Sequence, residues 1–344
     1  MIELKAIEYL IGEKPFYLGI IKAKDLVENF KVDSWSITNP QGYQRNLSQN
    51  RSKKFSDYLS KCKGIFHQTV LINIRDKKNI EYKNSNSTLK IDDPIYLVDG
   101  QHRISGLKIL LESQPSYGDM PVPILVLKGF NREQEAREFL IVNKTQKGVR
   151  TDLADRLLSH VISEMDKELL EVIGIREPKK LTELIVDVCD KLNKTKGTAW
   201  YKRITLPNQK TKKNETIKQR SMTESLKYLA KDSYIQSNYK SAKKLTDLLI
   251  LYWAAVKELC PKACGDTAKD YVLLKPAGPF ILHRLLPFVA IQGGPNLTKT
   301  KIKNILAKIE EMNDDAWHKK GDLGEGSNQK FFNARFEDFK GQLG

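Results

Sequence analysis

The sequence has no long hydrophobic run, and this shortage excludes most membrane proteins. Its longest uninterrupted apolar stretch, at 248–256, is nine residues long, about half of what a membrane-spanning helix needs. The first ten residues, MIELKAIEYL, place charged side chains among the apolar ones and therefore lack the hydrophobic region of a signal peptide. These features predict a protein without membrane segments that acts in the cytoplasm.

Cysteine is also scarce, with four residues in a chain of 344. So few cysteines exclude the disulfide framework that is typical of small secreted proteins. Cys260 and Cys264 form the sequence CPKAC, which resembles half of a structural zinc site. Such a site needs four ligands, and no second pair of cysteines or histidines lies nearby in the sequence. We therefore expect ordinary thiols and predict no protein-bound metal.

Glycine and proline are too infrequent for a fibrous protein, and acidic residues are outnumbered by basic ones. The chain has 58 lysines and arginines against 42 aspartates and glutamates, a formal net charge of +16. Because 40% of the residues are apolar, the chain can bury an ordinary core, and wholesale disorder is excluded. The positive charge predicts polyanionic partners or acidic small molecules such as nucleotides.

The first 145 residues combine strand and helix patterns. Short apolar runs, most of them rich in β-branched residues, predict strands at 16–21, 69–74, 95–98 and 122–127. Apolar residues then recur at helical spacing over 104–111, directly after the third run. Asn131 and Gln134 form a capping-box pattern that opens a further helix. The polar stretch 79–90 predicts a surface hairpin or loop.

From Thr151 onward the apolar residues follow the helical period. Thr151 is a suitable N-cap for a helix with one apolar face. That face comprises Leu153, Leu157, Val161, Met165 and Leu169. Similar patterns predict helices at 245–259 and 300–311, and the glycine-rich stretch 321–328 predicts a loop. We therefore expect an α+β protein with one domain at 1–150 and a mainly helical domain at 151–344.

Three residues of types that often occur in binding sites are interpreted as structural. Tyr252 and Trp253 lie on the apolar face of a predicted helix, so both are expected in the core. His283 lies within the apolar sequence PFILHRLLP and is expected to be a hydrogen-bonded histidine in the core or at an interface.

The segment 191–220 holds more than half of the excess positive charge. It contains ten basic residues and one acidic residue, Glu215, a net charge of +9. Trp200 and Tyr201 interleave with the basic residues. The segment is either a solvated lysine-rich loop or a surface that neutralises nucleic-acid phosphates, which requires clustered cations. In the second case, the residues expected to contact DNA are Lys202, Arg203, Lys210, Lys212, Lys213, Lys218 and Arg220.

The sequence Asp99-Gly100-Gln101-His102-Arg103 joins a predicted buried strand to a predicted helix. Such a turn points backbone N–H groups and the positive end of the helix dipole at a ligand, and it binds phosphate readily. Gly100 permits close approach of the backbone, and Arg103 supplies a fork that matches phosphate. His102 can donate to phosphate or move a proton, while Asp99 can hold a Mg²⁺-bound water or orient the histidine. Asp-Gly turns before helices are common, so the pattern alone is not specific.

The longer sequence VDGQHRISGL resembles the signature of the DGQHR-domain family. This family includes the DndB-like proteins of DNA phosphorothioation and a ParB-like ATPase (DpdB-like) of the 7-deazaguanine DNA-modification system. Further segments resemble the family pattern in the same order. They are GYQR at 42–45 before a polar helix at 48–60, NKTQK at 143–147, WYKRI at 200–204, YW at 252–253 and LKPAG at 274–278. The resemblance covers most of the chain.

The resemblance implies a fold similar to the ParB/sulfiredoxin superfamily, in which the strand–turn–helix cradles nucleotide phosphates. Sulfiredoxin carries a catalytic cysteine at the place of Gln101, and because glutamine cannot form a thiolate, sulfur reduction is excluded. ATP, or another nucleoside or deoxynucleoside triphosphate, and Mg²⁺ are then the expected cofactors. The candidate catalytic residues are Asp99, Gln101, His102 and Arg103. The candidate nucleotide-binding residues are Gly100, Arg103, Gln44, Arg45, Asn143, Thr145 and Gln146.

Two of these groups have structural alternatives. Arg45 with Gln44 can equally form a surface salt bridge, and Asn143, Thr145 and Gln146 can equally form the turn that ends a helix. The sequence does not decide between the two roles in either case.

The resemblance implies a nucleotide-hydrolysing, DNA-binding partner in bacterial or phage DNA modification, of the type that inserts 7-deazaguanine. Its expected partners are DNA, a nucleoside triphosphate and a transglycosylase-like base-exchange enzyme, and a homodimer is one option. The alternative is a non-catalytic DNA-binding regulator of a phosphorothioation operon, which uses the same turn for binding alone. A nuclease is a weaker alternative, because the sequence has no carboxylate cluster suited to two-metal hydrolysis.

Overall fold

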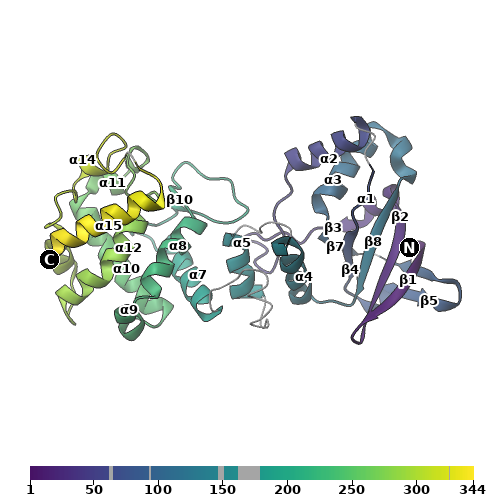
Figure 1. Ribbon diagram of the computed structural model, residues 1–344, viewed down its shortest axis with the longest axis horizontal. Helices are drawn as coiled ribbons and strands as arrows, with labels where there is room; N and C mark the ends of the chain where they lie inside the picture. Colours follow the sequence, from purple (N-terminus) through teal and green to yellow (C-terminus); the bar gives the residue numbers. More distant parts are fainter. Residues whose placement is uncertain (62–64, 93, 146–150, 162–178, 325) are drawn as a thin grey trace. The chain divides into compact units, whose positions relative to one another are not determined.

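The computed structural model describes all residues except 62–64, 93, 146–150, 162–178 and 325. Two compact units make up the chain: unit 1, Met1–Arg176, and unit 2, Glu177–Gly344. Unit 1 contains a large sheet with helices, and unit 2 is mainly helical (Figure 1), so the predicted α+β class is confirmed. The predicted domain boundary at residue 150 lies outside the described residues. No described helix has both the length and the apolar content needed to cross a membrane.

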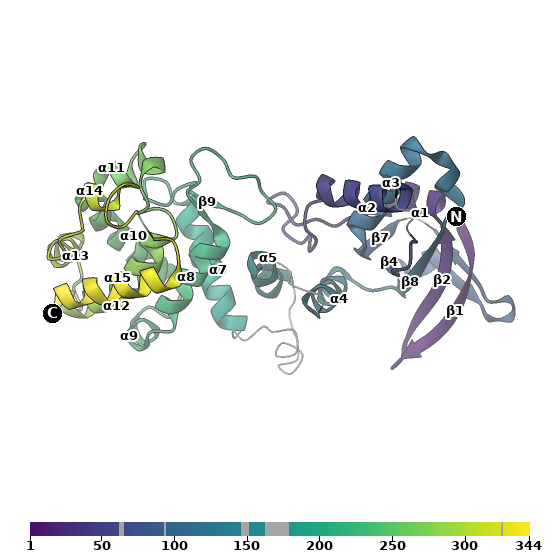
Figure 2. The same ribbon diagram turned by 45° about the horizontal axis from the view of Figure 1, so that its top comes forward.

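Unit 1 is built on an eight-stranded sheet whose order is β3-β7-β4-β8-β2-β1-β6-β5. Figure 2 shows its two longest strands, β1 and β2, as a projecting hairpin. The strands are β1 (Ile2–Ile11), β2 (Lys14–Lys22), β3 (Phe30–Lys31), β4 (Val70–Ile74), β5 (Ile80–Lys83), β6 (Thr88–Ile91), β7 (Ile95–Asp99) and β8 (Pro121–Lys128). The four predicted strands correspond to β2, β4, β7 and β8. The polar stretch 79–90 forms the β5–β6 hairpin, while the charged N-terminal strand β1 was not predicted.

Helices accompany the sheet of unit 1, and one of them opens with the predicted capping box. They are α1 (Ala23–Asn29), α2 (Gln49–Lys61), α3 (Gln101–Ser113), α4 (Arg132–Thr145) and α5 (Thr151–Arg156), which continues into a π-helical turn (Leu157–Val161). The predicted capping box is present: the Gln134 N–H donates to Asn131 Oδ1 at 2.9 Å, and the Asn131 N–H donates to Gln134 Oε1 at 3.0 Å. Met165 and Leu169, predicted on the face of the helix from Thr151, lie outside the described residues.

Unit 2 packs amphipathic helices around a second core. They are α7 (Lys179–Lys194), α8 (Gln219–Ala230), α9 (Ser233–Asn238), α10 (Ala242–Leu259), α11 (Pro261–Cys264), α12 (Ala277–Gly293), α13 (Lys299–Leu306), α14 (Asp314–Trp317) and α15 (Gln329–Leu343). The helix predicted at 300–311 ends earlier, at Leu306, because the chain turns there and brings Ile309 and Met312 into the core. Residues 321–324 and 326–328 are without helix or strand, as predicted for that stretch.

The three residues interpreted as structural lie in this second core. Tyr252 and Trp253 on α10 are buried, and His283 on α12 is fully buried. Trp253 donates to His283 Nε2 at 3.0 Å, and the Ser225 hydroxyl lies 3.0 Å from His283 Nδ1. Both ring nitrogens are therefore paired, and burial lowers the pKa of His283 to about 3. The interpretation of all three as core residues is confirmed.

Candidate functional site

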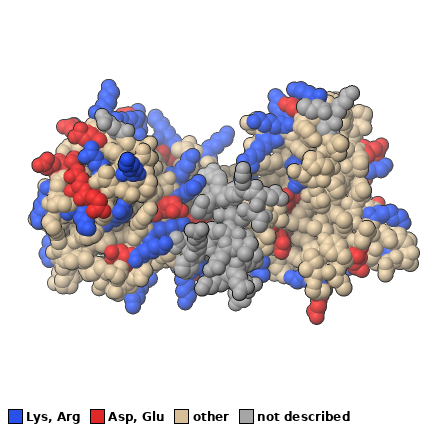
Figure 3. All heavy atoms as spheres, viewed as in Figure 1, with Lys and Arg blue, Asp and Glu red and all other residues tan. Residues whose placement is uncertain are grey.

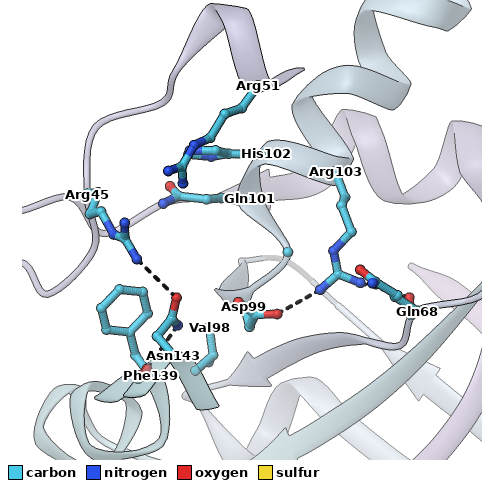
Figure 4. A pocket seen from close by; sticks show the side chains of 11 residues that line it. Arg45, Arg51, Gln68, Val98, Asp99, Gln101, His102, Arg103, Phe139 and Asn143 are labelled. Atoms are coloured by element: carbon cyan, nitrogen blue, oxygen red, sulfur yellow. Dashed lines mark hydrogen bonds and ion pairs between the residues drawn. The ribbon is translucent and has the colours of Figure 1, made fainter. Parts of the chain in front are cut away.

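The turn between β7 and α3 forms the floor of a cavity of about 180 Å³ in unit 1 (Figure 4). Its lining comes from separate segments that the fold brings together: the turn itself, the loop before α2, the start of α2, the loop before β4, and α4. The lining residues are Arg45, Arg51, Gln68, Val98, Asp99, Gly100, Gln101, His102, Arg103, Phe139 and Asn143. The predicted DGQHR turn is thus part of a cavity that contains three arginines.

Gly100 determines how the chain enters α3. Its φ of +102° is in the region that side-chain-bearing residues rarely adopt, and an added Cβ would lie 3.2 Å from a methyl group of Val70. Gly100 is the N-cap of α3 and has no side chain to cap the helix. The first N–H groups of α3 are therefore left for a ligand or solvent at the edge of the cavity.

A second glycine of the motif, Gly106, brings α2 against α3. A Cβ at Gly106 would lie only 2.5 Å from the carbonyl oxygen of Ser52 and 3.2 Å from the Cβ of Phe55, so no larger residue fits without moving α2. This close approach places Arg51, in the first turn of α2, beside His102 (Figure 4). The glycine in ISGL therefore positions a cation of the site that lies far away in sequence.

His102 is half-buried, and its Nδ1 is buried without a hydrogen-bond partner in the described part of the chain. Burial lowers the pKa of His102 below its usual value of 6.5, and the positive charges of Arg51 and Arg45 lower it further, against the opposing effect of Asp99. At neutral pH the ring is therefore mostly uncharged. An anion placed among these groups would favour the protonated form.

Gln101 is 8% exposed, and its Oε1 is buried without a partner among the described residues. Its side chain extends across the cavity towards Arg45 (Figure 4). Buried polar atoms are rarely left without a partner, so an unpaired amide beside an unpaired imidazole indicates a place for a ligand or water. The amide can present either its oxygen or its NH₂ group to such a ligand.

Arg103 makes contacts within the protein. One guanidinium nitrogen lies 2.7 Å from Asp99 Oδ2, and the other donates to the carbonyl oxygens of Gln68 at 3.0 Å and Thr69 at 3.3 Å. Arg103 thereby holds the loop before β4 against the turn (Figure 4). Contact between Arg103 and a phosphate stays a prediction.

A Mg²⁺ ion that enters with a nucleotide usually needs only one or two protein carboxylates. Asp99 is the carboxylate of the cavity lining, and its Oδ2 is already paired with Arg103. In the described ranges no three metal-ligating side chains form a cluster. The residues present therefore fit an ion held mainly by phosphates, with Asp99 as its contact to the protein.

The GYQR segment lies against the end of β7. An added Cβ at Gly42 would overlap the Ser34 carbonyl oxygen at 2.2 Å, which explains the glycine. The Tyr43 hydroxyl donates to the Leu97 carbonyl at 3.3 Å, and the Gln44 amide donates to the Leu97 and Val98 carbonyls. Gln44 therefore lies beneath the cavity and is not part of its lining.

Arg45 is the residue of the GYQR segment that reaches the cavity. Its guanidinium donates to Asn143 Oδ1 at 3.3 Å (Figure 4). Both predicted residues thus line the same cavity, although they are 98 positions apart in sequence. Asn143 also donates to the Phe139 carbonyl at 2.9 Å, a bond within α4.

One face of α4 connects the cavity to a buried ion network. Glu135, Phe139 and Asn143 follow one another at four-residue spacing and therefore lie on the same face. Glu135 is fully buried and accepts hydrogen bonds from Arg75 at 2.6 and 3.0 Å, which fixes the start of α4. Thr145 ends α4 and its side chain is not described, and Gln146 lies outside the described residues.

Arg51, Gln68 and Phe139 line the cavity but were not predicted as site residues. Arg51 could have been predicted from the sequence, because it lies in the first turn of a predicted polar helix shortly after the GYQR segment. Phe139 has no signal of its own, because it is one of several apolar residues in the helix that follows the capping box. Gln68 had no signal, because it is an exposed loop residue whose place depends on tertiary contacts.

The basic segment 191–220 runs from the end of α7 to the start of α8 in unit 2. It holds two short parallel strands, β9 (Ile204–Thr205) and β10 (Ile217–Lys218), and the loop between them projects from the helices (Figure 1). Basic side chains lie around this loop (blue in Figure 3). Nine of the ten basic residues are exposed: Lys191, Lys194, Lys196, Lys202, Lys210, Lys212, Lys213, Lys218 and Arg220. None of these nine is in an ion pair with another described residue.

The remaining cation and the aromatic residues of this segment have mostly structural roles. Arg203 is half-buried and donates to the carbonyl oxygens of Gly265 at 2.9 Å and Cys264 at 3.3 Å. Trp200 is fully buried against Trp253, so it is not accessible for stacking on a nucleic-acid base. Cys260 and Cys264 are buried free cysteines.

Glu215, the one acidic residue of the segment, organises the loop. Its carboxylate accepts hydrogen bonds from the Lys212 N–H at 2.8 Å and the Thr205 hydroxyl at 2.9 Å. The carboxylate is therefore used to hold the loop backbone and does not pair with the lysine side chains. The positive charge of the loop remains directed to solvent.

Comparison with known proteins bears on unit 1. No curated protein and no solved structure gives a significant match to the chain. Residues 4–167 match the model of the DndB family, described as DNA-sulfur modification-associated. The matched range contains every residue that lines the cavity. The match covers less than half of the chain, and it makes this part similar to proteins associated with DNA modification.

Proposed function

We propose that this protein is a DNA-binding factor of a DNA-modification system that binds the phosphates of a nucleotide in the cavity of unit 1. The observation that carries the proposal is the convergence of Arg45, Arg51 and the start of α3 on unpaired polar atoms of Gln101 and His102. Arginine and exposed helix N–H groups are the usual ligands of phosphate in proteins. A cavity of about 180 Å³ suits phosphate groups, with the remaining parts of a nucleotide outside it.

The proposed DNA contact is made by unit 2. Nine exposed cations without carboxylate partners among the described residues provide the clustered charge that neutralises phosphates. Six of the seven residues predicted to contact DNA are among them, while the Arg203 guanidinium is occupied by two backbone carbonyls. The family match supports DNA as a partner through its description alone.

The type of modification is part of the proposal. The matched family is described as DNA-sulfur modification-associated, which favours a sulfur system. Insertion of 7-deazaguanine, with a transglycosylase-like partner, stays a prediction from the resemblance of the DGQHR segment. Hydrolysis of the nucleotide, with His102 moving a proton, likewise stays a prediction.

The second candidate is a DNA-binding regulator that binds a nucleotide without hydrolysing it. One observation favours it: Asp99, the carboxylate of the cavity lining, is paired with Arg103 at 2.7 Å. The hydrogen bond from Arg103 occupies Asp99 Oδ2, so this oxygen is not available to orient a water molecule or the histidine. In this case the cavity acts as a sensor.

The test of nucleotide binding is calorimetry of the full-length protein with Mg²⁺-ATP, Mg²⁺-CTP, Mg²⁺-GTP and Mg²⁺-dATP. We expect heat of binding from at least one of them, at one site per chain. The absence of binding by all four, with pyrophosphate also inert, would contradict the phosphate site.

The two candidate functions are separated by turnover. A factor that consumes the nucleotide should release phosphate with DNA present, and His102→Ala should lower this rate more than the affinity. Cells that carry His102→Ala should then lack the modification in digested DNA, as mass spectrometry would show. A regulator should release no phosphate. Because the variant still binds the nucleotide, it should control operon transcription normally, and the modification should persist.

A further inference from the structure

The β1–β2 hairpin carries an exposed apolar surface outside the cavity. Six large side chains on these strands expose 38–66% of their surface: Ile7, Tyr9, Leu10, Ile11, Leu18 and Ile20. Five of them, all except Leu10, lie on one face of the hairpin and together leave on the order of 500 Å² of apolar surface open, within the range of the largest patch that a monomer exposes. In the space-filling view this part of unit 1 is largely free of charged side chains (tan in Figure 3).

The same hairpin has an open strand edge. β1 pairs with β2 over Ala6–Ile11, but with β6 only over Ile2–Lys5. The Ala6 N–H donates to the Ser87 carbonyl at 3.0 Å on the β6 side. Because alternate residues of a strand face the same edge, the backbone N–H and C=O groups of Glu8 and Leu10 point outward there.

The pairing of β1 with β2 also indicates that the N–H and C=O groups of Leu10 point to the open edge. Leu10 lies opposite Pro15, which has no N–H to donate, so the two residues do not form a hydrogen-bonded pair. No strand in the described part of the chain covers the edge at Glu8 and Leu10. An uncovered edge that carries apolar side chains is a template for pairing with another strand.

We infer that the occupant of this edge is β1 of a second copy of the chain, paired antiparallel with Tyr9 on the two-fold axis. In this register Glu8 of each copy lies opposite Leu10 of the other, so all the open N–H and C=O groups of these residues form hydrogen bonds. Ile7 lies opposite Ile11, and their apolar side chains are in contact. The arrangement is closed, because each edge is used once.

Charge favours this register over its neighbours. A shift by two residues in one direction places Glu8 opposite Glu8, which is destabilising. A shift in the other direction moves Glu8 opposite Gly12, beyond the end of β1, and loses hydrogen bonds.

The first test measures the mass of the full-length protein in solution by light scattering during size-exclusion chromatography. We expect a dimer at tens of micromolar and a monomer for Leu10→Pro. The proline removes an N–H that faces the open edge and leaves the β1–β2 hydrogen bonds intact. Leu10→Lys is the second variant in case the proline perturbs the hairpin, and Ile37→Lys, at an exposed isoleucine elsewhere in unit 1, is the matched control.

The second test fixes the register. Tyr9→Cys places two thiols face to face across the axis in a non-hydrogen-bonded pair, a geometry that allows a disulfide. We expect a covalent dimer after mild oxidation, whereas Ile20→Cys, exposed on β2, should remain monomeric on a non-reducing gel. A monomeric wild-type protein at all concentrations would overturn the inference. A dimer that survives both Leu10 substitutions and does not cross-link through Tyr9→Cys would overturn it as well.

Discussion

Cations are concentrated in two regions of this chain, and the two regions are organised differently. In unit 1, Arg45, Arg51 and Arg103 come from separate segments and converge on one small cavity. In unit 2, nine exposed lysines and arginines follow one another along a single segment and do not surround a cavity. Convergent cations with fixed geometry suit one discrete anion, whereas dispersed cations suit an extended polyanion.

The backbone explains much of this difference. Two close approaches, at Gly100 and Gly106, hold the cavity of unit 1 in place, and no larger residue fits there without displacing a neighbour. The basic loop of unit 2 is held by the β9–β10 pairing and by Glu215, which binds backbone and side-chain groups of the same loop. The first region can therefore discriminate by shape, and the second by charge and ionic strength.

The largest effect should follow from removing the convergent cations. Arg45→Ala with Arg51→Ala is expected to weaken nucleotide binding by about 3–5 kcal/mol, since each charge-assisted hydrogen bond contributes about 1.5–3 kcal/mol. Calorimetry with the best-bound Mg²⁺-nucleotide measures the loss. The matched control is Lys53→Ala with Lys54→Ala, on the same helix and outside the cavity lining. If both double variants lost the same affinity for the nucleotide, binding would depend on total charge and not on the arginines of the cavity.

Low pH should reduce stability through His283 in the core of unit 2. Burial lowers the pKa of His283 to about 3, below its value in the unfolded chain. The stability that His283 contributes is thus fully present above pH 6.5 and is lost as the pH falls towards 3. Between pH 7 and pH 4 the free energy of unfolding of unit 2 should fall by about 3 kcal/mol.

Urea unfolding followed by tryptophan fluorescence measures this loss, because three of the four tryptophans, Trp200, Trp253 and Trp317, lie in unit 2. His283→Gln should be less stable at pH 7 but should lose the part of the pH dependence that belongs to His283. If the variant kept the same slope, the titrating group would lie elsewhere.

The exposed cations of segment 191–220 should determine how steeply DNA affinity falls with salt concentration. Replacing Lys210, Lys212 and Lys213 together by glutamine should flatten the slope of log K against log salt by about two to three units, if each contacts a phosphate. Fluorescence anisotropy with a short duplex at several salt concentrations measures the slope. The control replaces three exposed lysines of unit 2 outside the segment, Lys240, Lys308 and Lys330. Nucleotide binding should be the same in both triple variants.

The smallest effect is expected from protonation in the cavity. The pKa of His102 is lowered by burial and by the two arginines, and a bound anion should raise it again. Affinity should therefore increase as the pH falls from 8 to 5.5, by at most about tenfold per pH unit. Calorimetry in two buffers of different ionisation enthalpy should detect proton uptake, and His102→Gln should abolish it. Release of a proton on binding would contradict the expected rise in the pKa of His102.

Much of the local structure could be predicted from the sequence, because it depends on neighbours along the chain. The capping box of Asn131 and Gln134 and the turn at Asp99-Gly100 follow from short-range hydrogen bonding and backbone freedom. The helix period of 245–259 likewise predicted α10 and its buried face. The strand β1 was not predicted, because four of its exposed side chains are apolar and obscure the alternation.

Within the site, the sequence by itself determined the turn, the positive charge and the presence of His102 and Arg45. Only the tertiary structure decided that Arg51 faces His102, because this depends on the close approach of two helices at Gly106. It also decided that Gln44 and Trp200 are buried and that Arg103 binds the backbone of the loop before β4, since these contacts join residues from different elements. Residue types and local spacing are properties of the sequence, whereas the partner of each polar group depends on how the elements pack.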